Sequence, residues 1–532
     1  MRPYSRRLVF LLVFVFLTLS SFAQQTAPPA DLDAWVVRSM KQFDVPGLSI
    51  AIVKDGKVVL TKGYGVRKLG SPEPVDANTL FGIASNTKAF TSAALAMLVD
   101  EGKISWDDPV QKHLPGFQLY DPFVTREVMI RDLLSHRAGL GLGAGDLLFW
   151  PDTDVTREQV LNAVRWIKPA TTLRSRYAYN NLMFLVAGQI IPAKTGKTWD
   201  EFIRERIFTP LGMNSSTITS IGFKPGDNIA YPHSRGWRLE GPLAPIHFTK
   251  DETWAAAAGI KSSANDLAKW AILQLDHGKL PDGKRLFSEA AQHEMWSPQI
   301  MNRTSEPKGL MKPLKSNFSG YGLGWALKDY RGHKIVSHGG ALTGMVSTVF
   351  LVPDENLGIV VLTNQEESGA FSAIVYHIVD HYLGAPENDW IQGFYDQRQQ
   401  SMKRAADAEK LQDAARNARS QPSLPLAQYA GEYEDPWYGK ARITAENGKL
   451  VLQMTRTPLM VGELSHWQYN TFKAVFRDNT IPDAFVTFAM KADGTISEMT
   501  MIPTSSLADF SFDYQDLDFH PVPKPATNAG SK

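Results

Sequence analysis

The stretch FGIASNTKAFTSAALAML, residues 81–98, places Ser85 three positions before Lys88 and directly ahead of an apolar run. Side chains three positions apart share one face of a helix, so a helix here would bring the lysine ammonium group within reach of the serine hydroxyl. The apolar run predicts that this turn is buried, and burial lowers the pKa of a lysine toward the neutral form that a base needs. Serine is also a common helix cap, so this stretch alone leaves a capping role and a nucleophilic role open.

The same Ser-x-x-Lys pattern occurs a second time, at Ser305 and Lys308, in a stretch rich in glycine and proline with no apolar helix pattern after it. Nothing there would hold the two side chains together. Two rarer patterns favour the first site. YNN at 179–181 is the only Tyr-x-Asn in the chain, and HGG at 338–340 is the only His-x-Gly.

The three motifs, in this order, resemble the active-site elements of the serine β-lactamase and penicillin-binding-protein superfamily, and more closely its branch of class C β-lactamases, D-aminopeptidases and esterases. Four other stretches look like connecting segments of that family: IRDLLSHRAGL (130–140), AAAAGIKSSANDLAKW (255–270), YGLGW (321–325) and FLVPDENLGIVVLTN (350–364). The resemblance covers about residues 30–385. It implies an α+β fold, with an antiparallel sheet flanked by helices and a helical subdomain.

The resemblance also implies roles for individual residues. Ser85 would attack a carbonyl carbon, and Lys88 would assist its deprotonation. Tyr179 would pass the proton to the leaving group and then help to activate the water that releases the acyl group. Lys88 and Tyr179 would titrate as a coupled pair, so the base role is not divided between them here. Asn181 would hydrogen-bond either the substrate or Lys88.

The HGG motif is expected to bind the substrate. His338 begins a strand on which Ala341 would supply an oxyanion N–H group, and Gly340 would keep the strand face clear for the substrate. Many relatives carry lysine where this chain has His338. Histidine is largely neutral above a pKa of about 6.5, which argues against substrates that end in a carboxylate.

Element patterns predict one α+β domain followed by a smaller all-β domain. The predicted elements of the first domain are a hairpin around Asp55-Gly56, a helix over 87–99 and strands at 333–340, 345–353 and 357–364. The glycine-rich stretch 139–145 is predicted to be a mobile loop beside the active site.

Composition shifts predict the remaining boundaries. The expected segments are a signal peptide (1–23), a β-lactamase-related domain (30–385), a helical and proline-containing linker (386–425), a small lipocalin-like β barrel or sandwich (426–520) and a disordered tail (521–532). The lipocalin assignment comes from LAQYAGEYEDPWYG, which resembles a domain appended to some members of the family.

The N-terminus predicts export to the periplasm or the medium. Three arginines precede the apolar run 8–19, and Ser21-Phe22-Ala23 offers small residues at the positions that a signal peptidase reads. The alternative is an uncleaved membrane anchor, but the run is short for spanning a bilayer. The chain has no cysteine, which excludes disulfides, thiolate metal sites and a thiol nucleophile.

No other chemistry is indicated. The net charge is +1 with no block of like charge, which argues against a nucleic-acid partner. There is no His-Glu-x-x-His, so we expect no metal and no cofactor. The expected partner is a small-molecule or peptide substrate, and the sequence leaves the oligomeric state open.

The leading hypothesis is an exported serine hydrolase that cleaves an amide or ester, such as a D-amino-acid peptide, a β-lactam or a carboxylic ester, through a Ser85 acyl-enzyme. One alternative is a catalytically inactive cell-envelope protein whose β domain binds a ligand or partner. A third reading makes the β domain a cap over the hydrolase cleft. The sequence does not identify the acyl compound.

Overall fold

The computed structural model describes residues 26–219, 223–224, 226–250, 252–446 and 448–523. The predicted signal peptide, and all but the first three residues of the predicted tail, lie outside the described residues.

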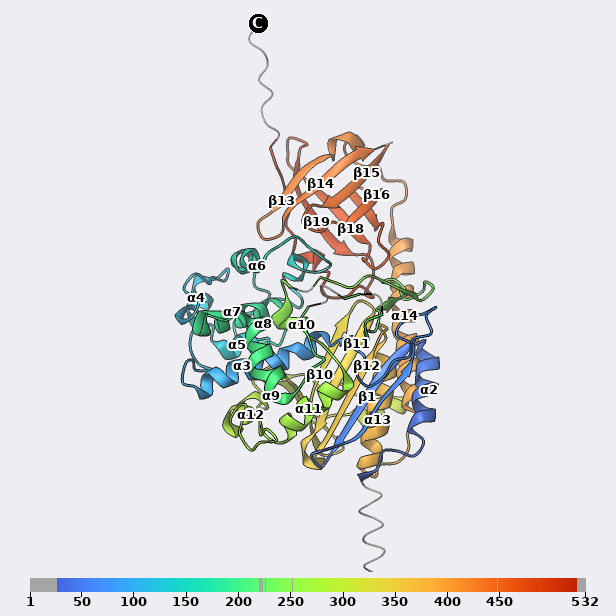
Figure 1. Ribbon diagram of the computed structural model, residues 1–532. Coiled ribbons are helices and arrows are strands. Elements are labelled where there is room, and N and C mark those ends of the chain that lie inside the picture. Colours follow the sequence, from blue (N-terminus) through green and yellow to red (C-terminus); the bar gives the residue numbers. More distant parts are fainter. Residues whose placement is uncertain (1–25, 220–222, 225, 251, 447, 524–532) are drawn as a thin grey trace, which may run out of the picture.

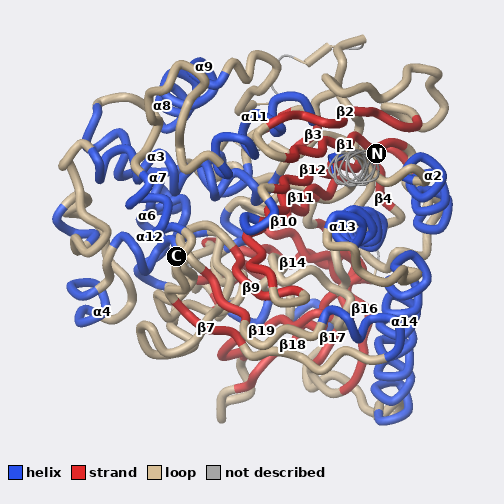
Figure 2. Tube along the Cα trace, turned by 90° about the horizontal axis from the view of Figure 1, so that it is seen from below, coloured by secondary structure: helices blue, strands red, loops and turns tan. Residues whose placement is uncertain are grey.

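The larger unit is built on an antiparallel sheet that joins both ends of the first domain (Figures 1 and 2). Its strand order is β2 (Lys57–Gly65), β1 (Gly47–Lys54), β12 (Leu357–Thr363), β11 (Met345–Val352), β10 (His333–Leu342), β9 (Ala326–Tyr330), β8 (Ser319–Tyr321) and β7 (Ile300–Asn302). Two short pairs lie outside it: β3 (Phe81–Gly82) with β6 (Lys261–Ser262), and β4 (His233–Ser234) with β5 (Ala244–Pro245).

Every residue of β1 is buried, because helices cover both faces of the sheet. Ile50 and its alternate neighbours pack into a core with α2 (Leu32–Phe43) and α13 (Ser368–Tyr382), whereas Ala51 and Val53 face the core of α11 (Ala264–Leu275). Figure 2 shows α2 and α13 on one side of these strands and α11 on the other.

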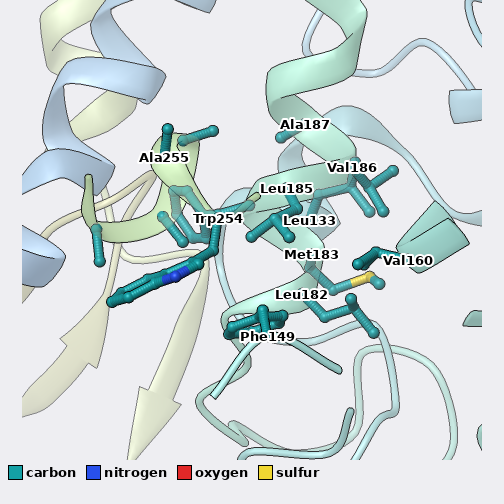
Figure 3. Packing of buried hydrophobic residues seen from close by; sticks show 14 of the residues in the cluster. Leu133, Phe149, Val160, Leu182, Met183, Leu185, Val186, Ala187, Trp254 and Ala255 are labelled. Carbon is teal, nitrogen blue, oxygen red and sulfur yellow. The ribbon is translucent and has the colours of Figure 1, made fainter. Parts of the chain in front are cut away.

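A helical subdomain lies beside the sheet on the α11 side (Figure 1). Its helices are α3 (Thr87–Asp100), α4 (Pro122–Glu127), α5 (Ile130–Leu134), α6 (Arg157–Ala163), α7 (Leu182–Thr195), α8 (Trp199–Ile203), α9 (Thr209–Leu211), α10 (Ala255–Ala258) and α12 (Glu289–Met295). Helix α7 is apolar nearly all round and packs between Leu133, Val160, Phe149 and Trp254 (Figure 3). It is therefore a buried central helix of the subdomain, with Asn181 as its N-cap residue.

The helix, strand and hairpin predictions for this domain are confirmed. Asp55 and Gly56 both have positive φ, 52° and 71°, as a two-residue turn that follows the twist of its strands requires. The predicted helix is α3, and the three predicted strands are β10, β11 and β12.

Helix α14 (Trp390–Ala415) connects this unit to the second unit, which is a nearly closed antiparallel barrel. The barrel order is β19 (Ile496–Pro503), β18 (Ala484–Met490), β17 (Thr471–Phe476), β16 (Val461–Gln468), β15 (Lys449–Met454), β14 (Gly439–Glu446), β13 (Gly431–Asp435) and β20 (His520–Pro521). Reciprocal backbone hydrogen bonds between Met499 and Phe519 bring its two ends together. Strand β20 ends at Pro521, the first residue of the range predicted as a disordered tail, and the boundary of that tail stays a prediction.

Across the described ranges, no helix is both long and apolar enough to span a bilayer.

Candidate active site

Ser85 lies in a single 3-10 turn, Ala84–Asn86, between β3 and α3. Ala84, directly before it, has φ of 48°, a left-handed conformation that costs an L-residue about 1–2 kcal/mol. No side chain caps this turn or α3 in this fully described segment, so the capping alternative for Ser85 is wrong. The Ser85 hydroxyl oxygen instead accepts a hydrogen bond from Lys88 Nζ at 2.9 Å.

Lys88 is fully buried on the first turn of α3. Besides Ser85, Nζ donates to Asn181 Oδ1 at 2.7 Å and to the Ala257 carbonyl at 3.0 Å. Burial lowers the pKa of Lys88 to about 7, against the opposing effect of the Asp146 carboxylate. A lysine with this pKa is available as a base near neutral pH.

Tyr179 lies three residues before the start of α7. Lys88 Nζ is 4.9 Å from its ring centroid, and the Ser85 side chain is a hydrogen-bond partner of its hydroxyl. Burial raises the pKa of Tyr179 well above its usual range, so the hydroxyl keeps its proton at neutral pH. The structure thus brings Ser85, Lys88, Tyr179 and Asn181 together.

His338 is buried and has both ring nitrogens in use. Nδ1 lies 2.6 Å from the Gly339 carbonyl oxygen, which only accepts, so Nδ1 carries the proton. Nε2 therefore accepts from the Tyr321 hydroxyl, 2.8 Å away. Burial, with the nearby Lys88 as a second cause, lowers the pKa of His338 to about 3, so the ring is neutral at neutral pH.

The edge of β10 is open beside His338. Pairing with β9 ends at Ser337, but β10 continues to Leu342, and Gly339 and Ala341 are exposed on this part of the strand. Strand N–H and C=O groups without a neighbouring strand are available to an extended ligand.

The prediction that Gly340 keeps the strand face clear for a substrate needs correction. A β carbon at Gly340 would lie 2.2 Å from the Ile83 carbonyl oxygen and 3.0 Å from the Ala84 β carbon. Glycine is therefore required because β10 packs directly against the turn that carries Ser85.

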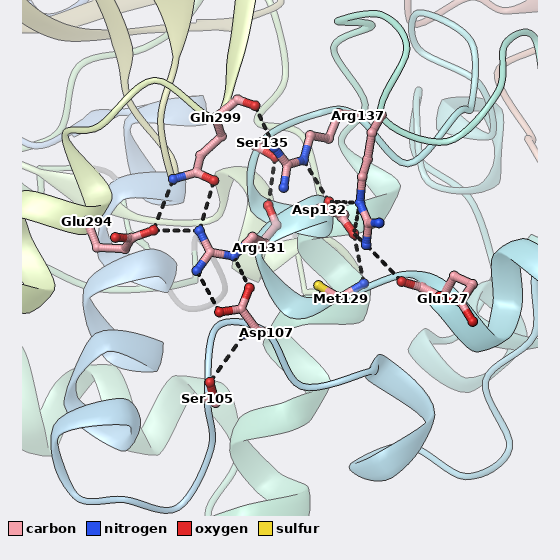
Figure 4. Close-up of polar contacts among 11 residues, drawn as sticks. Ser105, Asp107, Glu127, Met129, Arg131, Asp132, Ser135, Arg137, Glu294 and Gln299 are labelled. Carbon is pink, nitrogen blue, oxygen red and sulfur yellow. Dashed lines mark hydrogen bonds and ion pairs between the residues drawn. The ribbon is translucent and has the colours of Figure 1, made fainter.

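The stretch 130–140 is fixed by a buried ion-pair network (Figure 4). Asp132 is fully buried and accepts from Arg137 Nε at 2.6 Å, Arg174 Nη2 at 2.8 Å and the Met129 N–H at 2.9 Å. Each carboxylate oxygen thus has a donor, and the charge is balanced by guanidinium groups.

This network supports His136, which packs against the catalytic candidates. Its ring centroid lies 4.2 Å from that of Tyr179, and its Nδ1 accepts the Asn180 N–H at 3.0 Å. Burial lowers the pKa of His136 well below its usual range, so this ring is neutral as well. His136 therefore fixes the position of the YNN segment.

A cleft of about 560 Å³ opens onto Ser85. Residues from both domains line it, and no lysine or arginine is among its described lining residues. Its aromatic lining residues are Phe149, Trp150, Tyr177, Tyr179, Trp237, Trp254, Tyr321, Phe371, Phe510 and Phe512. The C-terminal domain contributes Thr480, Pro482, Leu507 and the segment 509–512. The barrel therefore forms one wall of the cleft.

The glycine-rich stretch 139–145 does lie beside the site, but it is not free. Residues 143–145 are buried, and Asp513 of the C-terminal domain accepts the Gly145 N–H at 2.6 Å and the Leu147 N–H at 3.2 Å. Between them, Asp146 is fully buried. The stretch is fixed by these contacts, contrary to the prediction of a mobile loop.

The second Ser-x-x-Lys lies outside a helix, with Ser305 and Lys308 both exposed. In the part of the chain that the structure describes, no cluster of three or more histidine or acidic side chains is suited to hold a metal ion.

Comparison with known proteins identifies the family of this chain. The family described as Beta-lactamase matches residues 32–382, about two thirds of the chain. The chain belongs to the β-lactamase family. Residues 415–521 match a second family, described as a domain of unknown function (DUF3471). The lipocalin-like assignment of this domain stays a prediction.

Two curated relatives support the membership. The chain is 31% identical over 464 residues to unguisins hydrolase ungD' of Aspergillus campestris, which covers 82% of each protein. It is 29% identical over 329 residues to penicillin-binding protein 4 of Amycolatopsis lactamdurans, covering 61% of this chain and 82% of that relative. Family membership points to a serine hydrolase acting on an amide or ester.

Solved structures share the two-part fold. The octameric penicillin-binding protein homologue from Pyrococcus abyssi matches with a TM-score of 0.58 at 23% identity, covering 92% of this chain and 99% of the other. The structure of SurE with D-Leu matches with a TM-score of 0.51 at 19% identity, covering 94% and 100%. At these identities the likeness concerns the fold alone.

Several residues of the site were not predicted. Tyr321 and His136 lie in stretches recognised only as family-like connecting segments, YGLGW and IRDLLSHRAGL. Asp146 follows the glycine-rich stretch, and Ser511 and Asp513 lie in the other domain. No sequence pattern signals that these residues gather around the motif residues.

Proposed function

We propose that the protein is a serine hydrolase that cleaves an amide or ester through an acyl-enzyme on Ser85. The observation that carries this proposal is the contact between Ser85 Oγ and the Nζ of a fully buried Lys88 whose pKa is lowered to about 7. A neutral amine at hydrogen-bond distance is what a serine hydroxyl needs to become a nucleophile.

The two pKa shifts support a division of the roles of Lys88 and Tyr179. Lys88 takes the proton of Ser85 as the Ser85 oxygen bonds to the substrate carbonyl carbon. Tyr179 keeps its own proton at neutral pH, since its pKa is raised. It therefore relays a proton from Lys88 to the leaving group as the bond to the carbonyl carbon breaks. A water molecule then attacks the acyl carbon, its proton passes to Lys88, and Ser85 regains its hydrogen when the acid product leaves.

The carbonyl oxygen would be held by backbone N–H groups of Ser85 and Ala341. The open edge of β10 at Ala341 and the position of Ser85 just before α3 support this assignment. Each such donor typically contributes about 2.7–4 kcal/mol to lowering the barrier.

The lining of the cleft favours apolar acyl groups without a carboxylate. His338 is neutral, and the other acidic or basic side chains described in the lining are the carboxyl groups of Glu366 and Asp509, whose pKa values burial raises. A substrate carboxylate would therefore meet no cation in this lining, whereas aromatic walls bury apolar area at about 25 cal/mol per Å². The barrel wall would limit the size of the substrate.

We also propose that the protein is exported, on the basis of its N-terminal charge and apolar pattern. The alternative of an inactive binding protein is disfavoured, because every polar atom of the Ser85–Lys88–Asn181 cluster needed for the reaction has a partner at hydrogen-bond distance.

A side-by-side rate comparison of nitrocefin, a p-nitrophenyl ester and a D-alanyl amide tests the proposal. At least one should be hydrolysed, with Ser85→Ala reducing the rate by about a thousandfold or more. Ser305→Ala is the matched control, since it removes the serine of the exposed Ser-x-x-Lys and should not change the rate. Equal rates for wild type and Ser85→Ala would refute the proposal.

A further inference from the structure

A chain of side-chain hydrogen bonds runs from the C-terminal domain to Lys88. Ser511 Oγ donates to Asp146 Oδ2 at 2.7 Å, and Asn181 Nδ2 donates to the same oxygen at 2.8 Å. The other end of the Asn181 amide, Oδ1, accepts from Lys88 Nζ at 2.7 Å. Asp146 and Ser511 belong to none of the three motifs.

The donor and acceptor chemistry of this chain fixes the Asn181 amide. An ionised carboxylate only accepts hydrogen bonds, and an ammonium group only donates them. Asn181 must therefore turn its NH₂ group toward Asp146 and its carbonyl oxygen toward Lys88. Without the carboxylate, the amide could flip and present a donor to Lys88, which would repel it.

Backbone contacts hold Asp146 at this position. Asp513 accepts the N–H groups on both sides of it, from Gly145 and Leu147. Asp146 is fully buried, and its second oxygen, Oδ1, has no hydrogen-bond partner among the described residues. A buried carboxylate with one oxygen unsatisfied carries a desolvation cost, and a role in the site would explain why it is kept.

Lys88 is the cation on which the charge of Asp146 acts. Burial raises the pKa of Asp146 to about 7, and Ser511, Asn181 and Lys88 oppose that rise. The titratable groups that face Asp146 from the packed elements are Lys88, Tyr179, Asp509 and Asp513. Those that face Lys88 are Asp146, Tyr179, His136 and His338, and Tyr179 stays neutral because its pKa is raised. Both histidines are neutral, so the loss of the Asp146 charge changes the pKa of Lys88 above all.

We propose that Asp146 is a positioning residue that orients Asn181 and Lys88 toward Ser85, and that the C-terminal domain holds Asp146 through Ser511. The inference rests on the proposed function, because it concerns the base that serves Ser85. The barrel is then part of the catalytic machinery as well as a wall of the cleft.

The test is the pH dependence of Ser85 labelling by a fluorophosphonate probe, which needs no knowledge of the substrate. In the wild type, Lys88 and Asp146 lose their protons as a coupled pair, so the acidic limb of the rate profile should show two overlapping steps. Asp146→Asn removes the carboxylate that favours the Lys88 ammonium form. The limb should become a single step and move to lower pH by about one unit.

Ser511 variants test the role of the barrel with the carboxylate still present. Ser511→Ala removes a donor that favours ionised Asp146, so the limb should move in the same direction by a smaller amount. Ser511→Thr keeps the hydroxyl and should restore the wild-type profile. Asp516→Asn is the charge-matched control, because it removes one negative charge from the same segment without touching Asp146.

The outcomes separate this inference from the proposed function. A wild-type protein without Ser85-dependent labelling would overturn the proposed function and, with it, this inference. Ser85-dependent labelling whose acidic limb is the same in Asp146→Asn and in the wild type would overturn the inference alone. Limb shifts of equal size in Asp146→Asn and Asp516→Asn would also overturn it, because the effect would then be one of general charge.

Discussion

Two aspartates, Asp132 and Asp146, are equally shielded from solvent, but their surroundings differ. Asp132 contacts two guanidinium groups, from Arg137 and Arg174. Asp146 contacts only an amide and a hydroxyl, and its nearest cation, Lys88, lies beyond Asn181. Buried carboxylates can thus have two different roles in one domain. A paired charge fixes the fold, and an unpaired one adjusts the pKa of a neighbouring base.

The largest effect that this comparison predicts is a loss of stability in Asp132→Asn. The substitution leaves Arg137 and Arg174 without an anionic partner, and breaking a buried ion pair in this way costs about 3–5 kcal/mol. The urea midpoint, followed by tryptophan fluorescence, should fall accordingly. The acidic limb of Ser85 labelling should stay where it is, because Asp132 does not contact Lys88. An unchanged urea midpoint would show that Asp132 is not a structural anchor.

A smaller effect of opposite sign is predicted for Asp146→Asn. The pKa of Asp146 is about 7 in the folded protein and about 3.9 when unfolded. Between these values the folded state holds a proton that the unfolded state has lost, so its stability falls as pH rises from about 4 to 7. A pKa shift of about three units corresponds to about 4 kcal/mol at pH 8. The buried amide of asparagine keeps part of the desolvation cost, so Asp146→Asn should raise the free energy of unfolding by roughly 2 kcal/mol at that pH.

The same gain should disappear at about pH 4, where the carboxyl group is protonated in the folded wild type. Urea unfolding of both proteins at the two pH values measures this. A loss of stability in Asp146→Asn at pH 8 would mean that Asp146 is a structural anchor like Asp132, and the comparison would fail.

Much of the first domain could be predicted because its signals are local. The hairpin at Asp55-Gly56, helix α3 and strands β10 to β12 each follow from turn residues and apolar periodicity within one segment. The resemblance to a family then connected Ser85, Tyr179 and His338, which lie far apart in the sequence. The structure brings these three residues to one cleft.

The rest depended on contacts that no local pattern records. Ser511 is 365 positions from Asp146, and its place in the site depends on how the barrel packs against the first domain. The role of Gly340 was misjudged because its need for glycine comes from the backbone at Ile83, on another segment. Glycine-rich composition likewise suggested a mobile loop at 139–145, where Asp513 holds the backbone in place.

Trapping the acyl-enzyme tests the central claim most directly. The protein is mixed with p-nitrophenyl acetate, quenched with acid during turnover, digested and analysed by mass spectrometry. We expect one acetyl group, on the peptide that contains Ser85, and none on that peptide in Ser85→Ala. Hydrolysis that proceeds without an adduct on Ser85, or an equal adduct in both proteins, would contradict it.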